Sequence, residues 1–78
     1  MLIQILGTGC PKCQKLMANV EEAVKRTGVE AEIEKVTQVA DIAKFGVAFT
    51  PALVIDGEVK ASGRIPSAEE IAAWLSEA

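Results

Sequence analysis

Hydrophobic and polar residues repeat along this chain with two different periods, and the changes of period mark the expected elements. Residues 1–6 form an apolar run that predicts a strand. Residues 11–27 carry apolar side chains every three or four positions, which is typical of a helix with one buried face. Pro11 suits the first position of that helix, and Gly28 can adopt the left-handed conformation that ends it.

The middle of the chain combines an alternating segment with a weaker helical one. Residues 29–34 alternate between apolar side chains and glutamate, which predicts a strand with one solvated face. Acidic residues in such a row more often keep an exposed edge soluble than form a catalytic cluster, and we interpret them in that way. Residues 37–45 have a helical pattern that stops at Gly46, so a short helix is expected there.

The last part of the chain predicts a hairpin and a closing helix. Residues 52–55 and 58–61 flank Asp56-Gly57, a dipeptide that favours a two-residue turn between antiparallel strands. Residues 67–70 have the pattern of a capping box that starts a helix. The inner face of this helix would carry Ile71, Trp74 and Leu75.

The element order and the composition restrict the class of protein. The order β-α-β-α-β-β-α, without a linker or an internal repeat, predicts one α/β domain over residues 1–78. Half of the residues are apolar and the net charge is −3, so the chain should fold by itself. The eight Lys and Arg residues are scattered and Tyr is absent, which argues against nucleic-acid binding. No apolar stretch approaches the ~20 residues of a membrane helix, so we expect a soluble, cytoplasmic monomer.

Both cysteines lie in the segment Gly7-Thr8-Gly9-Cys10-Pro11-Lys12-Cys13, where the first strand gives way to the first helix. A lone disulfide is seldom structural in the cytosol, and a two-residue gap closes too small a loop to stabilise the fold much. The amino end of a helix instead favours a thiolate, because its N–H groups lack partners and its dipole is positive there. The pair therefore predicts thiol and disulfide chemistry.

The strength of the helix-dipole effect predicts how far the pKa of the Cys10 thiol is lowered. A helix amino terminus contributes about 0.3–1 kcal/mol to an exposed anion and up to ~2 kcal/mol to a partly buried one. We therefore expect the pKa of Cys10 to lie about one unit below its ordinary value of ~8.5. Lys12 could add to this effect, although a lysine on an exposed helix start is usually only solvated. Cys13 begins the apolar stripe of the helix and should be the more buried sulfur.

Three features together resemble the thioredoxin superfamily in its small, glutaredoxin-sized form. They are an opening strand, the Cys10-Pro11-Lys12-Cys13 helix start, and Thr50-Pro51 directly before the strand, hairpin and helix that end the chain. Together with Phe45-Gly46-Val47, these motifs are similar to the small redox-active disulfide proteins of archaea and bacteria. The resemblance covers essentially the whole chain.

The resemblance implies a fold and a set of roles. It implies Cys10 as the attacking thiol, Cys13 as the resolving thiol and Pro51 as a cis proline beside them. The expected fold is a four-stranded mixed sheet flanked by three helices. In that sheet the strands would lie in the order 29–34, 1–6, 52–55 and 58–61.

The resemblance also implies a protein-disulfide reductase that needs no cofactor and holds no metal. Its partners would be disulfide-containing target proteins and a reductase of the thioredoxin-reductase type. The backbone of Thr50 would pair with an extended target segment, as an added strand does. Gly9, Phe49 and Ile65 would surround it as substrate-binding residues, while Pro11 and Lys12 would support the cysteines. Phe49 could equally be a core residue.

Two other classes of function stay open at this point. Copper(I) carriers also present two cysteines at this spacing before a helix, although their element order is β-α-β-β-α-β. Structural zinc needs four ligands, which two cysteines without histidine do not supply. A regulatory module could instead use its disulfide to sense redox state and change a partner-binding surface.

Overall fold

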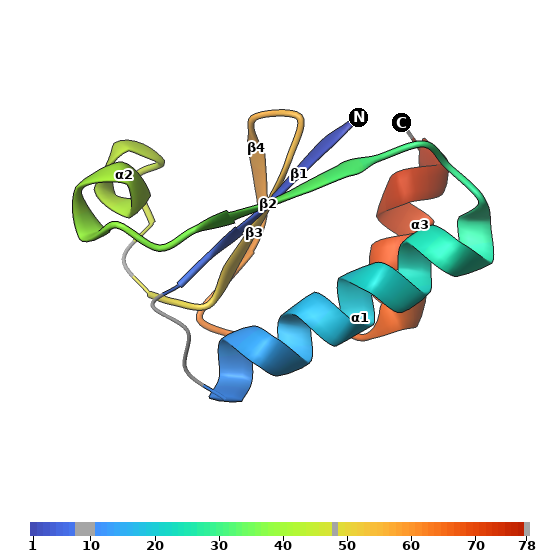
Figure 1. Cartoon of the computed structure of the whole chain (residues 1–78), viewed down its shortest axis with the longest axis horizontal. Coiled ribbons are helices and arrows are strands. Elements are labelled where there is room, and N and C mark those ends of the chain that lie inside the picture. The colour runs from blue at the N-terminus through green and yellow to red at the C-terminus, as the bar shows by residue number, and fades with distance from the viewer. Residues whose placement is uncertain (8–10, 48, 78) are drawn as a thin grey trace.

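The computed structural model describes residues 1–7, 11–47 and 49–77, and its elements follow the predicted order (Figure 1). The strands are β1 (Leu2–Leu6), β2 (Glu32–Val36), β3 (Ala52–Ile55) and β4 (Glu58–Ser62). The helices are α1 (Pro11–Thr27), α2 (Val39–Lys44) and α3 (Ala68–Glu77). In the described ranges no helix is long and apolar enough to cross a membrane.

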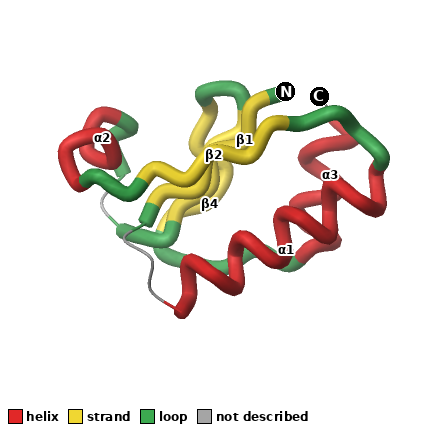
Figure 2. The backbone as a smooth tube through the Cα atoms, viewed as in Figure 1, coloured by secondary structure: helices red, strands yellow, loops and turns green. Residues whose placement is uncertain are grey.

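The strands form one mixed sheet in the order β2-β1-β3-β4, which confirms the predicted fold. Strand β1 pairs with β2 in parallel and with β3 in antiparallel, and β3 and β4 form the antiparallel hairpin. Helices α1 and α3 lie together on one face of the sheet, and α2 lies toward the other (Figures 1 and 2). The α1 helix therefore runs back from one end of the sheet to the other, as a parallel β1-α1-β2 connection requires.

The main core lies between the sheet and the helices α1 and α3. Helix α1 contributes its apolar stripe and α3 contributes two fully buried side chains, as their periodicity predicted. The members of this core are Ile3, Ile5, Leu16, Val20, Ala23, Leu53, Ile55, Ala61, Ile71 and Leu75. Trp74 is only half-buried and packs at the margin of this core, where the guanidinium carbon of Arg64 lies 5.9 Å from its ring centre.

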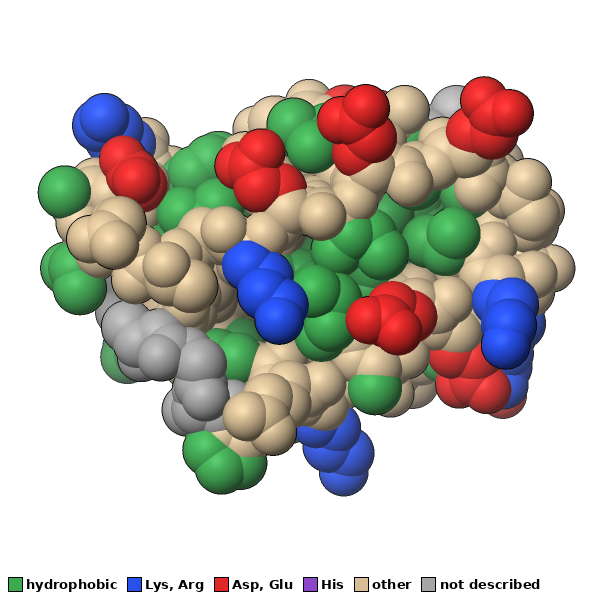
Figure 3. Space-filling model, in the orientation of Figure 1, with side chains coloured by type: hydrophobic (Ala, Val, Ile, Leu, Met, Phe, Trp, Pro, Cys, Tyr) green, Lys and Arg blue, Asp and Glu red, His purple; other side chains and the backbone are tan. Residues whose placement is uncertain are grey.

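The opposite face of the sheet is covered less completely. A smaller apolar cluster lies beneath α2 and consists of Leu6, Val36, Ile42, Ala52 and Val54. Strand β3 is buried along its whole length because it lies inside the sheet and contributes to both clusters. On the side of the main core, hydrophobic side chains remain visible between α1 and β2 (Figure 3), because β2 forms one edge of the sheet.

Strand β2 starts three residues later than the alternating pattern predicted. The ladder with β1 begins where Leu2 pairs with Glu32, and the Glu32 N–H donates to the carbonyl of Met1 at 2.9 Å. Residues 28–31 instead connect the end of α1 to that edge strand. The predicted facing is nevertheless confirmed, because the apolar members are half-buried against the main core and the glutamates are exposed. These are Val29, Ala31 and Ile33 against Glu30, Glu32 and Glu34.

Turns end the elements where the sequence placed them. Helix α2 is shorter than the predicted 37–45, because Phe45 caps it and Gly46 follows with φ of +74°. Asp56 and Gly57 both have positive φ, 49° and 83°, which is the backbone of a type I′ hairpin turn. The Asp56 carboxylate also accepts a hydrogen bond from the Leu2 N–H at 2.8 Å, so the turn is fastened to β1.

The start of α3 is capped on one side only. The Ser67 hydroxyl accepts a hydrogen bond from the Glu70 N–H at 3.1 Å, as the capping pattern predicted. The carboxylate of Glu70 does not complete the reciprocal box, because in the described part of the chain it pairs with both terminal nitrogens of Arg64, at 3.3 and 3.2 Å. Glu70 therefore ties the loop after β4 to the first turn of α3.

We predict that Ser67→Ala lowers the free energy of unfolding by about 1 kcal/mol, within the range of about 0.5–2 kcal/mol seen for lost caps. For a domain of this size that corresponds to a fall in melting temperature of about 4–8 °C, measured by circular dichroism. Ser76→Ala in the last turn of the same helix is the matched control, since Ser76 is exposed and its side chain forms no hydrogen bond with another described residue. Equal melting temperatures for the two variants would contradict the assigned cap.

Candidate active site

Cys13 lies in the first turn of α1 and is 7% exposed. Its burial agrees with its position at the head of the apolar stripe of that helix. Cys10 and Gly9 fall within residues 8–10, which lie outside the described residues. Their predicted roles stay predictions, whereas Pro11 is found at the first position of α1, as expected.

Gly7, directly after β1, allows the helix to approach the sheet at this point. A Cβ atom built on Gly7 would collide with the Cys13 Sγ atom, and would lie 3.4 Å from the Cys13 Cβ and 4.0 Å from the Pro51 Cα. The absence of a side chain at Gly7 therefore lets the sulfur of Cys13 and the backbone of Pro51 lie against the same backbone segment. The Gly7 N–H donates to the Val36 carbonyl at 3.0 Å, which holds this segment beside the end of β2. The sequence assigned no role to Gly7, and its only signal was a glycine just before the cysteine motif.

Pro51 lies against the same glycine, Gly7, as the Cys13 sulfur. The Thr50-Pro51 peptide bond is cis, and Pro51 is fully buried. Its carbonyl accepts a hydrogen bond from the Gly63 N–H at 3.0 Å, so the loop after β4 is joined to the start of β3. Thr50 is exposed, and within the described ranges its backbone N–H and carbonyl take part in no hydrogen bond.

Phe49 is a surface residue and not part of the core. Its side chain is 68% exposed, so the core interpretation is wrong, and its substrate-binding role stays a prediction. The ring and Cβ of Phe49 lie over Gly63, where an added Cβ would come within 2.9 Å of the Phe49 Cβ. Gly63 also has φ of +71°, a conformation that favours glycine. The structure thus brings Phe49, Thr50 and Gly63 together at one end of the sheet.

Two further predicted site residues differ in exposure: Ile65 is half-buried, whereas Lys12 is exposed. Ile65 is half-buried and packs against the main core, two residues beyond Gly63. The loop that carries it is also held by the Asn19 side-chain amide, which donates to the Pro66 carbonyl at 3.0 Å. Lys12 is exposed in the first turn of α1 and forms no ion pair with any described residue.

A small cavity adjoins Cys13 on the side of β2. It has a volume of about 60 Å³ and is lined by Ile5, Gly7, Cys13, Gln14, Met17, Lys35 and Thr37. None of these described lining residues is a carboxylate, which agrees with the absence of Asp and Glu from the first strand. Sequence analysis missed Lys35 and Thr37 at this site, because they approach Cys13 only through the pairing of β1 with β2.

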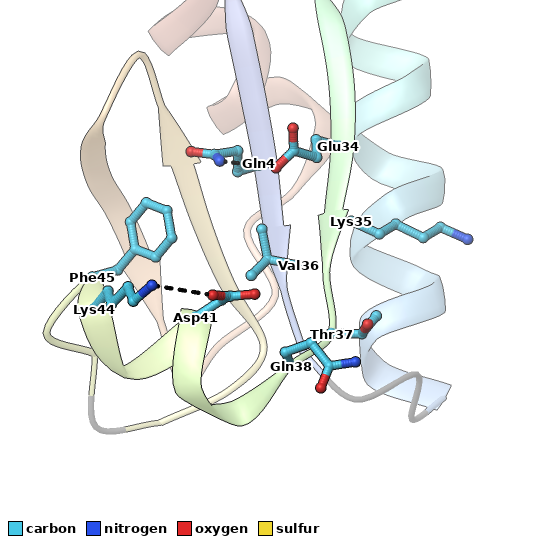
Figure 4. A pocket seen from close by; sticks show the side chains of 9 residues that line it. All are labelled: Gln4, Glu34, Lys35, Val36, Thr37, Gln38, Asp41, Lys44 and Phe45. Carbon is cyan, nitrogen blue, oxygen red and sulfur yellow. Dashed lines mark hydrogen bonds and ion pairs between the residues drawn. The ribbon is translucent and has the colours of Figure 1, made fainter.

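A second, shallow hollow lies over the opposite face of the sheet, between α2 and the strands β1 and β2 (Figure 4). Its volume is about 340 Å³, and Phe45 and Val36 supply its apolar wall. The Gln4 amide donates to Glu34 at 3.2 Å, and Lys44 pairs with Asp41 at 3.5 Å within it. Cys13 and Pro51 are not among the described residues that line this hollow.

Comparison with known proteins agrees with this arrangement. The family described as Thioredoxin domain matches residues 1–76. A protein named Thioredoxin from Methanothermobacter thermautotrophicus is 49% identical over 76 residues, which are 97% of this chain and 99% of that protein. A protein named Thioredoxin from Methanocaldococcus jannaschii is 48% identical over 71 residues, which are 91% of this chain and 81% of that protein. With this fold, this arrangement around Cys13 and these relatives, the chain belongs to the thioredoxin family of thiol–disulfide oxidoreductases.

Proposed function

We propose that this protein is a protein-disulfide reductase that works through Cys10 and Cys13. The observation that carries the proposal is the position of the Cys13 sulfur, which is buried in the first turn of α1 against Gly7. The same glycine lies against Pro51, next to the exposed backbone of Thr50. Because Cys13 is buried, an exchange reaction would begin on the other sulfur, that of Cys10. The exposed backbone of Thr50, just before β3, would let a target bind next to it.

The proposed reaction has two steps that balance in electrons and protons. The Cys10 thiolate attacks one sulfur of the target disulfide, a mixed disulfide forms, and the first target thiolate leaves. Cys13 then loses its proton to solvent and attacks the Cys10 sulfur, which forms the Cys10–Cys13 disulfide and releases the second target thiolate. The target gains two electrons, and its two thiolates take up two protons from solvent, one of which replaces the proton that Cys13 released. A reductase of the thioredoxin-reductase type would return the pair to its dithiol form, and the protein itself needs no cofactor.

Target recognition in this proposal uses the surface around Thr50. An extended target segment can pair with the N–H and carbonyl of Thr50, because both groups are available. The exposed ring of Phe49 adds an apolar contact of the kind that tolerates many target sequences. Gly9 and Ile65 would complete this surface. A broad range of protein disulfides fits such a site better than one small molecule.

The two rival functions are less well supported. A copper(I) carrier would have the element order β-α-β-β-α-β, whereas α2 here stands between β2 and the β3-β4 hairpin. A regulatory module would be oxidised once without turning over, and turnover measurements distinguish it from a reductase. We place the activity in the reducing cytoplasm, in which a structural role for one disulfide is rare.

The direct test is reduction of insulin with dithiothreitol as the electron source. We expect multiple turnovers with the natural chain and none with Cys10→Ser or Cys13→Ser. Cys13→Ser that has been reduced and freed of dithiothreitol should in addition accumulate a covalent adduct with insulin, visible by non-reducing electrophoresis, because no thiol is left to resolve the mixed disulfide. Cys10→Ser should form none. An adduct on Cys10→Ser alone would reverse the assigned roles, and stoichiometric oxidation without turnover would support the regulatory alternative.

The acidity of Cys10 is a second test. Because α1 begins at Pro11, its open amino end should lower the pKa of the Cys10 thiol by about one unit. The measurement is the thiolate absorbance at 240 nm as a function of pH, on Cys13→Ser. A pKa at or above the ordinary value of ~8.5 would refute the role of the helix terminus.

Gly7→Ala tests the contact beneath the cysteine. The added methyl group must displace the Cys13 sulfur, and overpacking of this kind typically costs about 1–3 kcal/mol of stability. We expect a lower melting temperature and a slower second step, seen as an adduct that persists for longer in the insulin assay. Ala18→Ser on the exposed face of α1 is the control; it should leave the second step unchanged and cost only the difference in helix propensity, less than about 0.7 kcal/mol. If Gly7→Ala resolved the mixed disulfide as fast as the natural chain does, the assigned contact would be wrong.

A further inference from the structure

The charged residues of this chain are distributed unevenly between the two ends of the sheet. We call the end that holds Cys13 and Pro51 the cysteine end. It contains the start of α1, the end of β2, α2 and the loop from β4 into α3. Five cations and four carboxylates lie there, which leaves a local excess of one positive charge. They are Lys12, Lys15, Lys35, Lys44 and Arg64, with Glu34, Asp41, Glu69 and Glu70.

The opposite end of the molecule is acidic. It contains the last turns of α1, the connection to β2 and the turn between β3 and β4. Six carboxylates and three cations lie there, namely Glu21, Glu22, Glu30, Glu32, Asp56 and Glu58, with Lys25, Arg26 and Lys60, which pairs with Glu58 at 3.5 Å. The net charge of −3 therefore hides a cysteine end of the opposite sign.

Three of these cations approach the cysteine end from three separate elements. Lys12 precedes Cys13 in α1, and Lys35 lines the cavity beside Cys13. Figure 4 shows that Lys35 projects from β2 to the side of α1, away from Glu34. Arg64 follows Gly63, whose N–H is bound to the Pro51 carbonyl.

Ion pairs with carboxylates compensate only part of this positive charge. Lys12 and Lys35 form no ion pair among the residues that the structure describes, and Arg64 shares its charge with Glu70. Lys44 is paired with Asp41 and contributes little. Lys12, Lys15 and Lys35 are therefore positions at which a charge can be removed without breaking an ion pair with a described carboxylate. Of these three, Lys12 directly precedes Cys13 and Lys35 lines the cavity beside it, so these two are the ones to change.

The size of the molecule keeps the two ends electrically separate. Its longest dimension is 32 Å, whereas the Debye length at physiological ionic strength is about 8 Å. A target that docks at Thr50 experiences the nearby lysines and Arg64, and the distant glutamates are largely screened. Local charge of this kind raises the rate of association with groups of opposite sign.

We propose that this protein prefers disulfides that are flanked by carboxylates, such as those within acidic protein segments. This inference rests on the proposed function and adds the chemical class of its substrates. Lys12 and Lys35 are the residues that set the preference. They act on the encounter with the target, and the exchange of sulfur bonds is the one described above.

The test compares three small disulfides of similar size. They are the dianionic 3,3′-dithiodipropionate, the neutral 2-hydroxyethyl disulfide and the dicationic cystamine. The measured quantity is the second-order rate constant for oxidation of the reduced protein at low ionic strength. For each variant, the rate constant with dithiodipropionate is divided by the rate constant with cystamine, and this anionic-to-cationic ratio is compared between variants. Rate constants for different disulfides are not compared directly, because their leaving thiols differ in acidity. The same ratio also cancels any change in the nucleophilicity of Cys10.

We expect Lys12→Gln combined with Lys35→Gln to lower this ratio about fivefold or more, because two charges of the same sign are removed beside Cys13. The difference should shrink to less than twofold in 0.5 M salt. Lys25→Gln combined with Arg26→Gln removes the same charge at the acidic end and should change the ratio by less than twofold. The neutral disulfide reports on the proposed function itself: if it fails to oxidise the protein, that function is wrong. If it reacts but the two double variants have the same ratio, only the charge preference is overturned.

Discussion

The contact of the Cys13 sulfur with the backbone of Gly7 is the constraint on which the rest of this site depends. A glycine at the end of β1 lets the first turn of α1 sit directly against the sheet, so the sulfur is buried while the start of the helix stays at the surface. The same glycine lies close to Pro51, the residue directly before β3. One missing side chain thus joins three segments that are far apart in the sequence.

The surrounding scaffold keeps this contact in place. The stripe of α1 packs against β1 and β3 in the main core, which fixes how far the helix lies above the sheet. On the other side of Pro51, Gly63 donates to its carbonyl, and the Arg64–Glu70 pair holds the following loop against α3. An exposed ion pair contributes at most about 1 kcal/mol, so the packing of the helices and not the charges supplies most of this stability.

Charge has a different part in this small protein. The carboxylates of the acidic end keep an exposed sheet edge soluble, as the alternation of residues 29–34 indicated. The lysines near Cys13 come from α1 and from the far end of β2, and they meet only because the parallel connection returns the chain to the same end of the sheet. In the charge preference that we propose, solubility and recognition are served by opposite ends of one molecule.

The sequence by itself determined the features that depend on consecutive residues. The limits of α1, the turn at Asp56-Gly57, the cap at Ser67 and the family motif around the cysteines all follow from local periodicity and from the backbone preferences of single residues. The tertiary structure decided what depends on distant partners. It moved the start of β2 to Glu32, because the ladder with β1 sets the register.

It also placed Phe49 over Gly63 at the surface, and brought Lys35 to the cavity beside Cys13. Each of these contacts joins residues more than ten positions apart. Their geometry depends on how complete elements pack, and no short stretch of sequence carries that information.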